Sequence, residues 1–112
     1  MITIVIVMTR RLPLAPYIVD TLMRDLVGHD RAPSAFLVYL WLWHNTRAVG
    51  RRRLAASLQM LATETGLSKS SIQNAVRTLT RRRLLAVERP GSTEPPIYVV
   101  LENWRRLTRG AV

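Results

Sequence analysis

The stretch from residue 57 to residue 85, SLQMLATETGLSKSSIQNAVRTLTRRRLL, constrains the fold more than any other part of the chain. Gly66 divides it into two helical patterns, because glycine adopts the left-handed conformation that ends a helix. Ser68 follows as an N-cap whose hydroxyl accepts hydrogen bonds from the first amides of the next helix. In that helix the apolar residues recur at helical spacing and predict one buried stripe, made of Ile72, Ala75, Val76 and Leu79.

The opposite face of this second helix is polar and cationic. Such side chains donate hydrogen bonds to base edges and phosphates: amides pair with adenine and guanidinium groups with guanine. A helix, a glycine-containing turn and a second helix with this face form a helix-turn-helix. We therefore predict a DNA-binding helix surface comprising Ser68, Lys69, Ser70, Ser71, Gln73, Asn74, Arg77 and Arg81. An ordinary solvated helix surface is the alternative.

The charge of the chain favours a polyanionic partner. The formal net charge is +10 and the pI is about 11.7, which predicts attraction to nucleic acid. The window from Arg47 to Arg83 holds nine basic residues and one acidic residue. Arg47 itself is a predicted phosphate contact. We expect further contacts to the DNA backbone from Arg51, Arg52, Arg53, Arg82, Arg83 and Arg89. Arginines at a helix C-terminus are also favoured by the helix dipole without any partner.

The flanking segments predict the remaining elements. Residues 1–9 are apolar and β-branched, so they either form a short strand or were added by an upstream choice of start. A signal peptide is not expected, because no basic segment precedes the apolar run. Residues 16–27 predict an amphipathic helix that ends at Gly28 and either packs on the domain or forms a dimer. Residues 32–47 predict a buried helix in which Trp41 and Trp43 anchor the core.

The sequence predicts three strands. One is short and covers residues 51–56. The other two, at residues 84–89 and 97–101, are expected to form a β-hairpin joined by the turn-rich sequence PGSTEPP. A short helix follows from Asn103, with Trp104 packed back on the domain and Arg105, Arg106 and Arg109 exposed.

This order of elements resembles the winged helix-turn-helix fold over residues 34–101. The sequence LATETGLSKSSIQNAVRTLTRRRLL is similar to the core of bacterial MarR-like regulators and of winged-helix modules in plasmid replication proteins. The resemblance implies that residues 69–79 form the recognition helix in the major groove, and that Ser70 or Ser71 contacts a phosphate. The wing tip departs from the basic tip of that family, because it contains Glu94 and no basic residue.

We therefore predict a mainly α fold with a small β wing: a three-helix core, a β-hairpin and an N-terminal helix. The expected divisions are residues 1–31 as an extension, 32–104 as the winged helix-turn-helix domain and 105–112 as a basic tail. The predicted function is sequence-specific binding of double-stranded DNA by a cytoplasmic, nucleoid-associated transcriptional regulator that either acts alone or forms a homodimer. The same fold would also suit the DNA-binding module of a replication initiator or a winged-helix protein-interaction module.

An enzyme is not expected. The chain has two histidines, seven carboxylates and no cysteine, and neither a phosphate-cradling glycine loop nor a pair of histidines at metal-ligand spacing occurs in it. We predict no cofactor, no metal and no catalytic residue. The apolar N-terminal run is too short to span a bilayer, so no membrane partner is expected.

Overall fold

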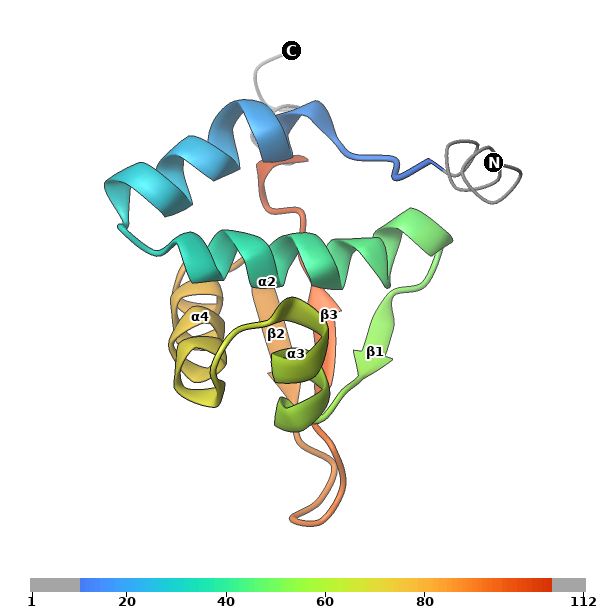
Figure 1. The fold of residues 1–112 in the computed structure, drawn as a ribbon. Coiled ribbons are helices and arrows are strands. Elements are labelled where there is room, and N and C mark those ends of the chain that lie inside the picture. Colours follow the sequence, from blue (N-terminus) through green and yellow to red (C-terminus); the bar gives the residue numbers. More distant parts are fainter. Residues whose placement is uncertain (1–10, 106–112) are drawn as a thin grey trace, which may run out of the picture.

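A computed structural model describes residues 11–105 of the chain (Figure 1). The predicted N-terminal strand at residues 1–9 and the predicted tail arginines Arg106 and Arg109 lie outside the described residues. The elements in chain order are η1 (Ile18–Leu22), η2 (Arg24–His29), α2 (Pro33–His44), η3 (Arg47–Val49), β1 (Arg53–Ala55), α3 (Leu58–Thr65), α4 (Lys69–Arg81), β2 (Leu85–Glu88) and β3 (Ile97–Val100).

The three-helix core is formed by α2, α3 and α4. Helix α2 begins with Pro33 in its first turn, a position where the missing amide costs nothing. It buries Val38, Tyr39 and Leu42 completely, because α3 and α4 lie below it and the N-terminal helix lies above it (Figure 1). The predicted buried helix and the predicted three-helix core are both confirmed.

The predicted aromatic anchors have different environments. Trp43 is 5% exposed, and its Nε1 donates to the carbonyl oxygen of Pro13 at 2.8 Å. Trp104 stacks on Tyr17 with ring centroids 5.0 Å apart, which confirms that it packs back on the domain. Trp41 contributes less than predicted, because it is only partly buried and packs against the edge of the core.

The N-terminal helix is predicted at the right place but differs in geometry. Both η1 and η2 are π-helical, and the helix passes through Gly28 to His29 instead of ending at the glycine. Only Ile18, Leu22 and Leu26 are buried. Val19 and Met23 belong to the same apolar pattern in the sequence but are 45% and 40% exposed, and Val27 is 40% exposed.

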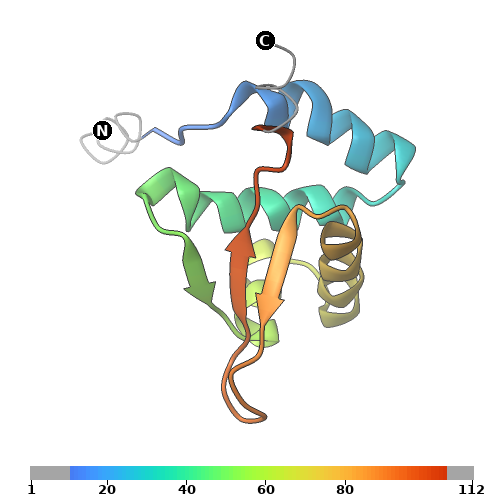
Figure 2. The same ribbon diagram turned by 180° about the vertical axis from the view of Figure 1, so that it is seen from behind.

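The sheet is antiparallel with the strand order β1-β3-β2, and the predicted hairpin of β2 and β3 is confirmed. Tyr98 of β3 lies between Leu54 of β1 and Val87 of β2 in the register. Figure 1 shows α3 over one face of the sheet, and Figure 2 shows the other face without a helix over it. The hairpin loop extends beyond the helices as a wing. The fold is therefore a winged helix-turn-helix.

Candidate nucleic-acid interface

The turn between α3 and α4 is held by local hydrogen bonds. Gly66 has a φ of +79°, and its amide donates to the carbonyl of Ala62 at 2.9 Å. Ser68 then caps α4, because its Oγ accepts from the Ser71 amide at 3.1 Å. Both features follow the sequence prediction. They fix the direction in which α4 leaves the turn.

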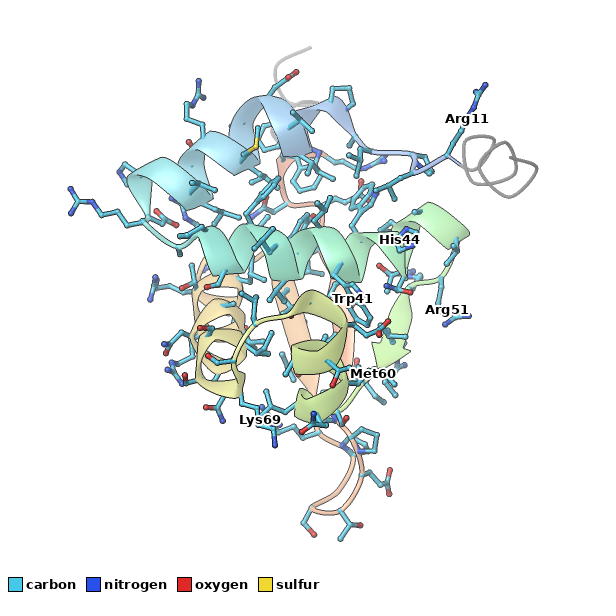
Figure 3. All side chains as sticks on the ribbon, in the orientation of Figure 1. Arg11, Trp41, His44, Arg51, Met60 and Lys69 are labelled. Carbon is cyan, nitrogen blue, oxygen red and sulfur yellow. The ribbon has the colours of Figure 1, made fainter. Side chains whose placement is uncertain are left out.

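Helix α4 has one buried face and one exposed face. Ile72, Ala75 and Leu79 are buried in the core shared with α2, whereas Val76 of the predicted stripe is only partly buried. The exposed face carries most of the predicted DNA-binding residues: Ser68, Lys69, Ser70, Gln73, Asn74, Arg77 and Arg81. Ser71 is half-buried and accepts a hydrogen bond from the Ser68 hydroxyl at 2.9 Å. Lys69 lies at the exposed start of the helix in Figure 3.

Two of the exposed residues are bonded to each other. Arg77 donates from Nη2 to Oδ1 of Asn74, one turn earlier on the same face. One lone pair of the Asn74 carbonyl oxygen is therefore occupied, and the amide nitrogen remains as a donor. Together the two side chains present mostly donors. The Gln73 side chain forms no hydrogen bond within residues 11–105, so both its donor and its acceptor groups remain available.

A groove separates α4 from the wing. Two adjoining hollows share Val76, Arg77 and Arg89, and the larger part of their floor is apolar. The floor includes Leu58, Ile72, Val87, Pro96 and Tyr98. The exposed residues Arg77, Arg81 and Arg89 form the rim. The apolar contribution of Tyr98 and Pro96 to this groove was not predicted, because no local pattern marks a wing residue as facing a helix.

Arg82 and Arg83 do not join this surface. Arg82 Nε donates to Oδ2 of Asp30 at 2.7 Å, and the Arg82 guanidinium also contacts Oδ1 of Asp30. This hydrogen bond with Arg82 lowers the pKa of Asp30 from 3.8 to about 2 and raises the pKa of Arg82. Arg83 has a φ of +59° and lines a hollow with Tyr17 and Asp25 of the N-terminal segment. The structure therefore directs both arginines towards the N-terminal helix.

The arginines before and in β1 are also separate from α4. Arg53 pairs with Glu88 on the outer face of the sheet. Arg47 donates to the Val100 carbonyl oxygen through Nε at 3.3 Å and through Nη2 at 2.8 Å, so it is held inside the domain. Arg51 and Arg52 are exposed at the β1 edge, whereas α4 lies beside β2 (Figure 1).

Two other classes of site find no support in the described part of the chain. Between residues 11 and 105, no group of three or more metal-ligating side chains lies together. No helix in the same span is long and apolar enough to cross a membrane.

Comparison with known proteins identifies the central domain. Residues 32–85 match a family model described as a helix-turn-helix domain. No curated protein and no solved structure shows significant similarity to the chain. The matched span runs from α2 through η3, β1, α3 and α4 to the start of β2, and it contains the helices that form and support the exposed face of α4. Residues 32–85 thus form a helix-turn-helix domain, a kind of domain that binds DNA.

Proposed function

We propose that the protein binds double-stranded DNA sequence-specifically, with α4 as a recognition helix in the major groove. The observation that carries the proposal is the division of α4 into two faces. Its aliphatic face is fixed in the core by Ile72, Ala75 and Leu79. That packing directs Gln73, Asn74 and Arg77 outward on a rigid helix. The major groove admits an α-helix and presents a distinct donor and acceptor pattern for each base pair.

The hydrogen bonding of the exposed face suggests which bases it reads. Guanine presents two acceptors in the major groove, N7 and O6, and the Arg77–Asn74 pair presents mostly donors. We infer that Arg77 contacts guanine and that Asn74 orients it. Gln73 keeps the donor and acceptor that adenine requires. The preferred site would therefore contain a guanine next to or near an adenine.

Contacts to the DNA backbone would come from both sides of α4. Three exposed cations are available, and none of them forms an ion pair within residues 11–105: Lys69, Arg81 and Arg89. The start of α4 would also suit a phosphate near Ser70, because helix N-termini bind anions. The apolar floor of the groove beside the wing suits the sugars of one strand. The tip of the wing beyond Arg89 offers no such contact, because residues 90–96 include Glu94 and no basic residue.

Selection of bound duplexes from a random pool, followed by gel-shift titration, tests the proposal. We expect an enriched site, and we expect Arg77→Ala to weaken binding to that site by about 1–3 kcal/mol while relaxing the preference at one base pair. Equal weakening on selected and random duplexes would contradict the assignment of Arg77 to base reading. Failure of the wild-type protein to retain any duplex at low salt would contradict DNA binding and favour a protein-interaction module.

Two biological roles are compatible with this binding. A transcriptional regulator and the DNA-binding module of a plasmid- or phage-type replication initiator both require the same recognition surface. The symmetry of the selected site separates them in part, because paired half-sites about one helical turn apart indicate a dimer that reads a palindrome. Repeated sites in one direction would favour the initiator.

A further inference from the structure

A second cationic surface lies at the β1 edge of the sheet. A hollow of about 310 Å³ opens between the end of α2, the residues that lead into β1 and the residues that follow β3. Trp43 forms part of its wall, and its charged lining consists of Arg47, Arg51, Arg52, Glu102 and Arg105. Four guanidinium groups and one carboxylate give this lining a net charge of +3.

The single carboxylate in the hollow is already neutralised. Glu102 has a side chain that is 8% exposed, lies 3.3 Å from Nη1 of Arg47 and also pairs with Nε of Arg105. No side chain in the described part of the chain pairs with Arg51 or Arg52, and both are exposed. Their charges are therefore free to meet an external anion.

The backbone that carries these two arginines is held in place. Gly50 has a φ of +73° and ends η3, which reverses the chain immediately before Arg51. The Arg51 amide donates to the carbonyl oxygen of Thr46 at 2.8 Å. Thr46 is fully buried and donates its hydroxyl to the Leu42 carbonyl oxygen at 2.6 Å. Because the loop is already ordered, an anion bound there would have to immobilise only side chains.

This hollow is remote from the recognition surface. The sheet order places β1 and β2 on opposite edges, and α4 lies beside β2. Figures 1 and 2 show α4 and β1 on opposite flanks of the molecule, and Figure 3 places Arg51 on the flank away from Lys69. A phosphate in the hollow would therefore not be one of those beside α4.

We propose that this hollow binds a phosphodiester of a DNA segment other than the one in contact with α4. The proposal rests on the proposed function only in naming α4 as the first contact. The planar guanidinium groups of Arg51 and Arg52 match phosphate oxygens bidentately, and the surrounding charge of +3 retains the anion. The second segment is either a distant part of the same duplex or a second duplex, and the two sources have separate tests.

The test compares wild-type protein with the double variant Arg51→Gln/Arg52→Gln. A charge-matched control, Arg24→Gln/Arg31→Gln, removes two exposed arginines of the N-terminal segment. One arm measures the salt dependence of binding to a long duplex with one selected site. The other arm saturates the protein with a short duplex that covers only this site, and then measures capture of a second duplex with a different label.

Loss of two phosphate contacts should lower the salt slope by about 1.8, so that raising salt from about 50 to about 200 mM weakens the control about twelve-fold more than the Arg51/Arg52 variant. This result in the long-duplex arm supports the same duplex as the source. Loss of second-duplex capture supports a second duplex. Identical behaviour of variant and control in both arms would overturn the proposal.

Further outcomes distinguish this proposal from two others: that the hollow is part of the recognition surface, and that the protein does not bind DNA sequence-specifically. If the Arg51/Arg52 variant loses affinity for the short duplex alone, the hollow belongs to the recognition surface and the proposal is wrong. Arg77→Ala should reduce the preference for the selected site and leave capture of the second duplex intact. If the wild-type protein has no preference for any sequence, the proposed function fails, while the comparison between variant and control still tests the hollow.

Discussion

Replacing Arg81 or Arg82 with glutamine tests whether the tertiary structure gives these adjacent arginines different roles, one in DNA binding and one in stability. Arg81 is exposed on the rim of the groove beside α4, whereas Arg82 is paired with Asp30. Each substitution removes one positive charge from the same end of α4. An argument from net charge alone predicts equal effects on DNA binding, but the structure predicts unequal ones.

The magnitude follows from the cations proposed to contact phosphates. These are Lys69, Arg81 and Arg89. If all three release counterions, the salt slope is about −2.7, and binding weakens about 40-fold between about 50 and about 200 mM salt. Arg81→Gln should reduce the slope to about −1.8 and the weakening to about 12-fold. Arg82→Gln should leave the slope at the wild-type value.

Arg82→Gln should instead lower stability. Asp30 has its pKa lowered from 3.8 to about 2, mainly by the hydrogen bond from Arg82. That shift alone corresponds to roughly 2.4 kcal/mol. The Arg82 side chain is 35% exposed, so solvent screening reduces the contribution to about 1 kcal/mol. For a domain of this size the melting temperature should fall by roughly 4–8 °C.

The assays are a gel-shift titration on the selected duplex at several salt concentrations and a thermal melt of each variant. Arg81→Gln should change the first measurement and not the second, and Arg82→Gln should do the reverse. Equal reductions in the salt slope would refute the reasoning, because they would mean that the ion pair with Asp30 opens when DNA binds.

The remaining predictions concern stability and assembly. Because the pKa of Asp30 is depressed in the folded state, the stability difference between wild type and Arg82→Gln should be complete above about pH 5 and disappear as the pH falls from about 4 to about 2, as measured by denaturant unfolding. Gly66→Ala should destabilise by about 1–2 kcal/mol through its φ of +79° alone, since nothing lies within 4 Å of the added Cβ. Arg83→Gly should show no comparable loss, since a φ of +59° suits glycine. A homodimer that uses the exposed row around Met23, which is 40% exposed, should dissociate in Met23→Glu; light scattering that finds wild-type monomers at high concentration would contradict it.

The elements that depend on neighbours in the chain could be predicted from the sequence. The stripe at Ile72, Ala75 and Leu79 is buried as expected, and Gly66 and Ser68 form the turn and the cap. The hairpin wing is also where its turn residues indicated. Periodicity, capping and turn chemistry act over a few residues, so they can be read without knowing the fold.

The fate of individual cations was decided only by the tertiary structure. Arg81, Arg82 and Arg83 are identical and consecutive, yet one faces the groove, one pairs with Asp30 and one lines a hollow beside the N-terminal helix. Asp30 precedes Arg82 by 52 positions, and no local pattern connects them. The same holds for the arginines near β1, which the sheet order carries away from α4. The sequence alone determined that this chain presents a cationic helix, and the packing of distant segments determined which charges remain free to bind.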